Sequence, residues 1–137
     1  MNILVVEDFE DLRNDLLKYL KEEIEPKHEI FACATGEEAA RIIKEKNIGL
    51  VFTNVSFYET LVYYHSEDKL MKGFDLHQLI NETSPKTEVV YITYSPSSED
   101  KDKAISLGAL DYISHKNYLE INFQHYIDET QKRLEKV

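Results

Sequence analysis

Short apolar runs recur along the whole chain and are separated by amphipathic stretches. Residues 3–6 are continuously apolar and rich in branched side chains, which is typical of a strand buried on both faces. Similar runs return at 50–53, 89–92 and 110–113, and residues 28–34 alternate in a way that also predicts a strand. The pattern therefore predicts five strands.

Helical periodicity fills the intervals between these strands. Leucines at helical spacing predict a first helix over about residues 12–23, and Pro26 ends it. Thr35, followed three residues later by Glu38, matches a capping box and predicts the start of a second helix that ends near Asn47. Each predicted helix thus follows directly on a predicted strand.

The second half of the chain continues this order. A short third helix is predicted over about residues 74–80. Ser97, with Asp100 three residues on, indicates the cap of a fourth helix, and Gly108 is its expected C-terminal stop. Apolar residues at helical spacing place the last helix over about residues 119–134.

This β-α order, repeated five times, fixes the expected fold class. Strands that are joined by helices must run parallel, with right-handed crossovers and helices on both faces of the sheet. The sequence predicts an α/β protein in which residues 1–137 form a single domain, because 137 residues leave little room for a second. In such sheets ligands bind at the carboxyl ends of the strands.

The composition narrows the class of partner. The net charge of −10 repels phosphate backbones and anionic membranes, so we expect no direct contact with nucleic acid or a membrane. No apolar run is long enough to span a bilayer, and the first residues lack the features of a signal peptide, which favours the cytoplasm. The single cysteine, Cys33, is expected to be a small hydrophobe in a buried strand.

Polar residues follow four of the predicted strands. Glu7 and Asp8 form an oxygen-rich pair that suits Mg²⁺, although Asp8 would serve equally well as a helix cap. Asn54 follows the third strand, Thr93 ends the fourth, and His115-Lys116 follows the fifth. Carboxylates, a hydroxyl and a cation that converge at one edge would suit phosphoryl chemistry. Taken singly, Thr93 is an ordinary strand residue and Lys116 an ordinary surface charge.

Four segments carry a family resemblance: ILVVED at 3–8, LVFTN at 50–54, VYIT at 90–93 and GALDYI at 108–113. In this order and spacing they resemble the receiver domain of bacterial response regulators over nearly the full chain. The resemblance implies a doubly wound, flavodoxin-like (βα)5 arrangement with strand order 2-1-3-4-5. No single motif is diagnostic, and the combination carries the match.

The resemblance also assigns roles to residues. It implies that Asn54 stands at the phosphoacceptor position, that Thr93 and Tyr112 are the switch residues, and that Glu7 and Asp8 would hold Mg²⁺. It further implies a sensor histidine kinase or another signalling protein as partner. A homodimer through the fourth helix, fifth strand and fifth helix is a further expectation.

Two positions depart from the family pattern. A neutral amide is a poor nucleophile, so Asn54 should not accept phosphate, and the loss of a negative ligand should leave Mg²⁺ binding weak at most. His115 aligns with the family's lysine, and Lys116 falls where a proline usually follows, so the cation position is displaced by one residue.

A third departure is the loop over residues 58–72, which is longer than the family pattern by roughly ten residues, an unusual length for a compact βα connection. Its aromatic and charged stretch, Tyr63 to Lys69, suggests either a lid or partner surface, or a tolerated insertion. The sequence does not decide between these.

The leading hypothesis is an atypical receiver domain, not an enzyme, that is not phosphorylated at the usual site and acts through regulated protein contacts. The alternative is a conventional phosphoacceptor receiver that carries an Asp-to-Asn substitution at 54. A flavin carrier of similar winding is a remote alternative, because Glu7 and Asp8 would repel the flavin phosphate.

Overall fold

The computed structural model describes residues 1–56, 71–114 and 120–135. Strands and helices alternate through these residues as the hydrophobic pattern predicts. In chain order they are β1 (Asn2–Val6), α1 (Glu10–Glu23), β2 (Glu29–Cys33), α2 (Gly36–Lys46), β3 (Ile48–Thr53), α4 (Gly73–Thr83), β4 (Glu88–Thr93), α5 (Ser98–Ser106), β5 (Asp111–Ser114) and α6 (Phe123–Glu135).

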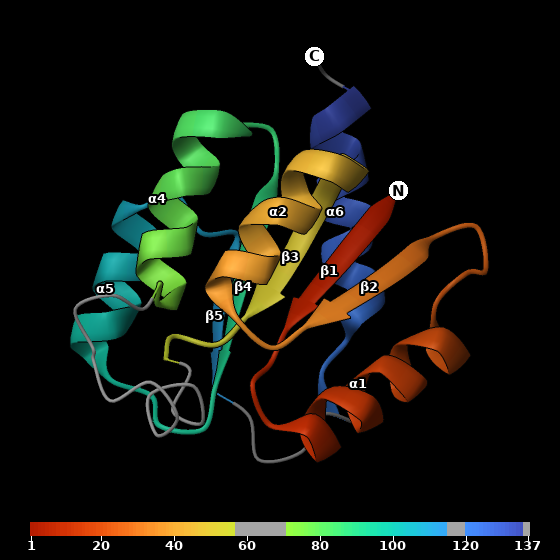
Figure 1. Ribbon diagram of the computed structural model, residues 1–137, viewed down its shortest axis with the longest axis horizontal. Helices are drawn as coiled ribbons and strands as arrows, with labels where there is room; N and C mark the ends of the chain where they lie inside the picture. The colour runs from red at the N-terminus through yellow and green to blue at the C-terminus, as the bar shows by residue number, and fades with distance from the viewer. Residues whose placement is uncertain (57–70, 115–119, 136–137) are drawn as a thin grey trace.

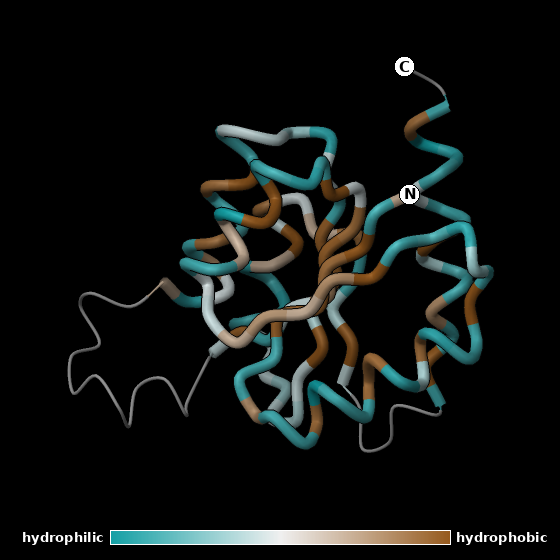
Figure 2. Tube along the Cα trace, turned by 45° about the vertical axis from the view of Figure 1, so that its right-hand side comes forward, coloured by the Kyte–Doolittle hydropathy of each residue, from teal (hydrophilic) through white to brown (hydrophobic). Residues whose placement is uncertain are grey.

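The strands form one parallel sheet in the order β2-β1-β3-β4-β5, which confirms the predicted topology (Figure 1). Helices cover both faces, because parallel strands need crossover connections. Residues of α2, α4 and α5 pack on one face, and residues of α1 and α6 pack on the other. In Figure 2 the hydrophobic strands run through the middle of the molecule, between more hydrophilic helices.

The central strand β1 shows why its sequence is continuously apolar. Leu4 and Val6 belong to the core on the α2 side, whereas Ile3 and Val5 belong to the core on the α1 side. All four are at most 1% exposed. A strand that is covered on both faces has no solvent side on which polar residues could alternate.

Several local predictions are confirmed. The Thr35 hydroxyl accepts a hydrogen bond from the Glu38 N–H at 3.1 Å, and the Ser97 hydroxyl accepts one from the Asp100 N–H at 3.0 Å. Gly108, just beyond α5, has a φ of +93°, a conformation that glycine adopts without strain. Cys33 is buried in β2, as expected for a small hydrophobe.

Two expectations at element ends are wrong. The N-cap position of α1 is Phe9, not Asp8, and no side-chain hydrogen bond caps this helix. Strand β3 begins at Ile48, two residues before the predicted start. Gly49 interrupts the apolar run and so hid the beginning of the strand, although Ile48 pairs with Asn2 before a register shift.

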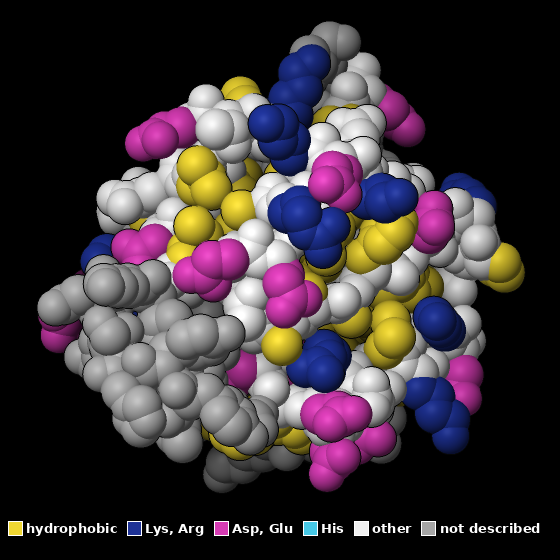
Figure 3. Space-filling model, viewed as in Figure 1, with side chains coloured by type: hydrophobic (Ala, Val, Ile, Leu, Met, Phe, Trp, Pro, Cys, Tyr) yellow, Lys and Arg dark blue, Asp and Glu magenta, His cyan; other side chains and the backbone are white. Residues whose placement is uncertain are grey.

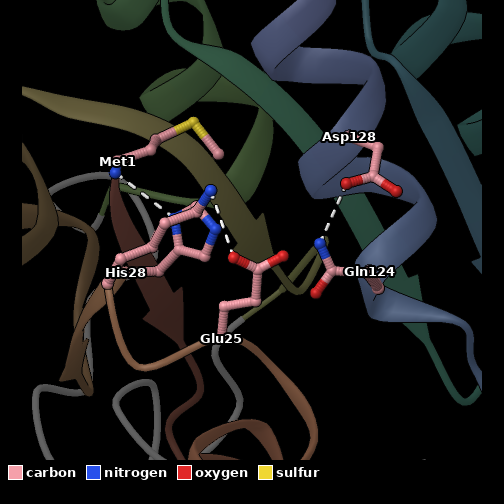
Figure 4. A network of polar contacts seen from close by, with 6 residues as sticks. Met1, Glu25, His28, Gln124 and Asp128 are labelled. Carbon is pink, nitrogen blue, oxygen red and sulfur yellow. Dashed lines mark hydrogen bonds and ion pairs between the residues drawn. The ribbon is translucent and has the colours of Figure 1, made fainter.

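The amino ends of the strands carry a small polar network (Figure 4). The Met1 amino group lies 3.3 Å from His28 Nδ1, and Lys27 forms an ion pair with Glu25 at 3.1 Å. Burial, the Met1 amino group and Lys27 lower the pKa of His28, while Glu25 raises it less. His28 Nδ1 thus lies beside the Met1 amino group, whereas His28 Nε2 is buried without a hydrogen-bond partner among the described residues.

No helix in the described part of the chain is long and apolar enough to cross a bilayer.

Candidate functional site

The carboxyl ends of β1, β3 and β4 meet at one edge of the sheet and enclose a pocket of about 70 Å³. This edge brings together Glu7, Asp8, Asn54 and Thr93, which the sequence singles out from three separate segments. The complete lining is Glu7, Asp8, Phe9, Asn54, Val55, Ser56, Thr93, Tyr94, Ser95 and Asp100.

Glu7 is the most buried charged residue of the pocket, with 1% of its surface exposed. Burial raises the pKa of its carboxyl to about 7; the Asn54 hydrogen bond lowers this pKa and the neighbouring Asp8 carboxylate raises it. One carboxylate oxygen, Oε2, accepts the hydrogen bond from the Asn54 amide. The other, Oε1, is buried and has no hydrogen-bond partner among the described residues.

Backbone contacts fix Glu7 in this place. Its N–H donates to the Cys33 carbonyl at 3.0 Å, which continues the pairing of β1 with β2 by one residue. The guanidinium of Arg13, one turn into α1, donates to the Glu7 carbonyl at 2.9 Å. The backbone of Glu7 is therefore held at the strand end by both neighbouring elements, β2 and α1.

Asn54 is positioned by the close approach of the backbone at Gly73 to the backbone at Asn54 and Val55. The Gly73 N–H, at the start of α4, donates to the Val55 carbonyl at 2.9 Å. A Cβ at Gly73 would collide with the backbone of Asn54 and Val55, so only glycine allows this approach. Val55 and Gly73 thus join the two ends of the long β3–α4 connection.

The Asn54 side chain presents a donor where the family resemblance implies an anionic oxygen. The amide nitrogen Nδ2 donates to Glu7 Oε2, so this side chain brings a donor and a carbonyl oxygen but no negative charge to the site. Glu7 and Asp8 supply carboxylate oxygens that suit a hard divalent cation. The described residues contain no group of three or more His, Cys, Asp and Glu side chains that could hold a metal ion. The fit to Mg²⁺ is therefore partial.

Thr93 and Tyr112, which the family resemblance implies as switch residues, lie on the adjacent strands β4 and β5. The Thr93 hydroxyl at the pocket accepts a hydrogen bond from the Ser95 N–H at 3.1 Å. Tyr112 is 9% exposed, and its hydroxyl accepts a hydrogen bond from the Ser97 N–H at 3.2 Å. Its ring lies beside Tyr91, with centroids 6.4 Å apart. Tyr112 is therefore turned inward and joined to the N-cap of α5.

A buried polar pair beneath α4 was not identified from the sequence. His77 Nδ1 lies 2.8 Å from the Tyr91 hydroxyl, which donates to the Gly73 carbonyl at 3.4 Å. Burial lowers the pKa of His77 to about 4, so the imidazole is neutral near neutral pH. The pair links the backbone at Gly73 to the aromatic stack in β4 and β5.

The other six lining residues also escaped the sequence analysis as site residues, among them Phe9, Tyr94 and Asp100. Phe9 and Tyr94 are 44% and 51% exposed at the mouth of the pocket. Each directly follows a residue that the sequence did identify, and Phe9 occupies an N-cap position where a capping side chain is usual. That missing cap was the available signal.

His115, Lys116 and the Tyr63–Lys69 stretch of the 58–72 loop lie outside the described residues. Met71, at the end of that loop, is described. Its N–H donates to the Glu37 carboxylate at the start of α2 at 3.0 Å.

Comparisons with known proteins agree with this geometry. The family model of the response regulator receiver domain matches residues 3–122. A protein named an NtrX-like response regulator, from Rickettsia bellii, is 28% identical over 114 residues, or 82% of this chain. The chain spans only 21% of that relative's length.

Solved structures show the same fold. The N-terminal domain of an uncharacterized protein from Wolinella succinogenes is 21% identical, with a TM-score of 0.77, and the match covers 100% of this chain and 99% of that one. The receiver domain of NtrC4 from Aquifex aeolicus is 25% identical, with a TM-score of 0.72, over 97% of this chain and 98% of that one. With its parallel sheet, the acidic pair after β1 and a family model that covers most of its length, the chain belongs to the response regulator receiver domain family.

Proposed function

We propose that this chain is an atypical receiver: a two-component signalling domain, formed by residues 1–137, that is not phosphorylated at the usual position and acts through regulated protein contacts. The observation that carries the proposal is Asn54, at the end of β3, whose amide donates to the buried Glu7 carboxylate. The proposal includes a cytoplasmic location and no catalytic activity of its own.

The chemistry of the amide supports the first part. Acyl phosphate formation requires an anionic carboxylate oxygen that attacks phosphorus, and a neutral amide supplies none. In addition, the Asn54 nitrogen is engaged by Glu7, so the side chain is held as a donor. A phosphoryl group that approaches this edge would meet the acidic Glu7 and Asp8 without the charge of a tightly held metal ion.

Glu7 and Asp8 are the residues that would hold Mg²⁺, and we expect its binding to be weak. The ion would supply charge neutralisation at the pocket when it binds. Two adjacent carboxylates attract a divalent cation, but the amide replaces a third anionic ligand with a hydrogen-bond donor.

The switch residues support the second part. Thr93 and Tyr112 are both present, and Tyr112 is joined through Ser97 to the start of α5. A change at the pocket that moved the β4–α5 segment would therefore alter the surface formed by α5, β5 and α6. We propose this surface as the place of homodimer or partner contact, with a sensor histidine kinase or another signalling protein as the partner.

The alternative function is a conventional receiver that carries a substituted Asn54. Apart from Asn54, the pocket retains the acidic pair and the hydroxyl that phosphoryl chemistry would use. If this alternative holds, an aspartate at position 54 alone should restore the acceptor.

Intact-mass analysis after incubation with Mg²⁺ and a small phosphodonor tests both, with Asn54→Asp as the second sample and Asn54→Ala as the matched control. We expect a gain of one hydroxylamine-labile phosphoryl group in Asn54→Asp alone. Phosphorylation of the unmodified chain would refute the proposal. If no sample is phosphorylated, the divergence extends beyond Asn54 and the conventional alternative is refuted.

A further inference from the structure

The acidic pocket combines negative charge with an unmet hydrogen-bonding need. Glu7, Asp8 and Asp100 all line it, in a chain whose net charge is −10. Glu7 is only 1% exposed, and its Oε1 accepts no hydrogen bond from any described residue. A buried carboxylate oxygen without a donor is unfavourable, so a ligand that brings a positive donor to it gains that interaction.

Two exposed aromatic side chains stand at the mouth of the same pocket. Phe9 and Tyr94 are 44% and 51% exposed, and both line the pocket. Phe9 occupies the N-cap of α1 without a capping hydrogen bond, where Ser, Thr, Asp or Asn would favour the helix. Local rules that are broken at one place usually mark a functional surface, and exposed aromatic residues are enriched in protein interfaces.

The chemistry of the pocket favours a guanidinium group over a metal ion. The Asn54 nitrogen, which faces Glu7, presents the positive end of an amide dipole and removes an anionic ligand. Guanidinium is weakly hydrated, donates several planar hydrogen bonds to carboxylates and stacks on aromatic faces. The pocket of about 70 Å³ is several times the ~10–15 Å³ that one water needs, so it admits a side-chain end but no folded segment.

We propose that this pocket binds an arginine side chain of a protein partner, with the guanidinium against Glu7 and Asp8 and its stem between Phe9 and Tyr94. This inference rests on the proposed function, because it names the chemistry of the partner that a receiver acting through protein contacts would recognise. The partner presents its arginine from a protruding segment, and the rest of the partner contacts the surface around the pocket.

The larger groove between α2 and α4 offers no comparable argument. It measures about 1030 Å³ and is lined by apolar residues of both helices, with Arg41, Lys44 and Glu45 on its border. Arg41 and Glu45 already form an ion pair at 3.2 Å. On the face that carries α2 and α4, acidic and basic side chains are interspersed (Figure 3), so no one charge of partner is favoured there.

The test is an NMR titration of the ¹⁵N-labelled full chain with the peptide acetyl-Gly-Arg-Gly-amide, in chelator-treated buffer. Matched peptides replace arginine by citrulline, its neutral isostere, or by lysine. We expect the arginine peptide alone to shift the Asn54 side-chain amide and the backbone signals of Phe9 and Tyr94, saturating at millimolar concentration. In Glu7→Gln and in Phe9→Ser the dissociation constant should rise at least tenfold.

The proposal would be overturned by no saturable shift at these signals, by equal shifts with the citrulline or lysine peptide, or by equal affinity in Glu7→Gln. Mg²⁺ that saturates the same signals at lower concentration than the peptide would overturn it as well. Binding that emerges only in Lys116→Gln would also overturn it, since the chain's own cation would then fill the pocket. The phosphorylation experiment does not depend on the NMR titration. The proposed function and the arginine site can therefore each fail separately, and the two failures are distinguishable.

Discussion

The two edges of the sheet each bury a titratable side chain, and the pKa of that side chain shifts in opposite directions at the two edges. At the amino edge His28 lies beside the Met1 amino group, and its pKa is lowered, so it remains neutral. At the carboxyl edge Glu7 lies beside Asp8, and burial raises its pKa to about 7. A neutral imidazole costs little to bury, whereas an ionised carboxylate beside another carboxylate costs much more.

Their surroundings differ in the same sense. At the amino edge the Thr87 hydroxyl donates to the Ile48 carbonyl at 2.7 Å, and Lys27 pairs with Glu25. At the carboxyl edge like charges gather and aromatic side chains stay exposed. Each edge buries a polar atom without a partner among the described residues, His28 Nε2 at one and Glu7 Oε1 at the other, but only Glu7 belongs to a group that ionises to a negative charge beside another carboxylate. The carboxyl edge therefore keeps the larger unfavourable feature, which a ligand or partner can relieve.

The largest expected contrast between the edges comes from two glycines. In Gly73→Ala the new Cβ meets the backbone of Asn54 and Val55, which cannot move aside, so we expect a loss of about 3 kcal/mol or more in the free energy of unfolding. In Gly49→Ala it meets the flexible Met1 side chain at 2.8 Å, so the change should stay within about 1 kcal/mol. Urea denaturation measures both. Equal losses in the free energy of unfolding for the two variants would show that the backbone at Gly73 is no more tightly packed than that at Gly49.

Glu7→Gln should stabilise the protein at pH 8 by about 1–2 kcal/mol. The folded pKa of about 7 lies above the ordinary value of 4.5, so the contribution of Glu7 to stability is present below pH 4.5 and is lost as pH rises through 7. This loss is worth about 3 kcal/mol at most, and a buried, unpaired amide N–H in the variant offsets part of the gain.

Urea denaturation of Glu7→Gln and the unmodified protein at pH 5 and pH 8, with chelator present, checks this expectation. The stabilisation should vanish at pH 5. An equal difference at both pH values would show that ionisation of Glu7 is not what destabilises this edge.

Phe9→Ser should stabilise the fold by about 1 kcal/mol, because serine at an N-cap accepts a hydrogen bond from the first turn of the helix. Thermal denaturation measures the effect, and Phe9→Ala is the control, since alanine removes the ring without adding a cap. If the serine variant is no more stable than the alanine variant, the missing N-cap hydrogen bond at Phe9 does not destabilise α1.

The smallest effect is expected at the amino edge. The pKa of His28 is lowered from the ordinary value of 6.5, so its contribution to stability is present above pH 6.5 and is lost as pH falls below it. His28→Gln should therefore flatten the acid side of the stability profile. Denaturation midpoints between pH 5 and pH 8 measure this, and an unchanged slope would show that His28 does not titrate in the fold.

Much of the fold could be predicted because its signals are local. The apolar run of β1, the capping spacing at Thr35 and the glycine at 108 each act within a few residues. The family resemblance then supplied the strand order. The start of β3 was missed because Gly49 interrupts the apolar run, and the N-cap of α1 was missed because Phe9 is an unfavourable cap.

The site was predictable only in part. Glu7, Asp8, Asn54 and Thr93 could be named because each directly follows or ends a strand. Tyr94 and Asp100 could not be placed at the pocket, because their position depends on the path of the β4–α5 segment. The His77–Tyr91 pair joins residues 14 apart in different elements, and neither residue carries a motif.

By itself, the sequence determined the order of strands and helices, the parallel α/β class and the absence of a carboxylate at position 54. These follow from periodicity, from the geometry of crossovers and from residue identity, all of which can be judged along the chain. Only the tertiary structure decided that the Asn54 amide turns to Glu7, that one Glu7 oxygen is buried without a donor within the described residues, and that Phe9 and Tyr94 flank the pocket. Burial and hydrogen-bond direction depend on neighbours from distant segments, and no local pattern specifies them.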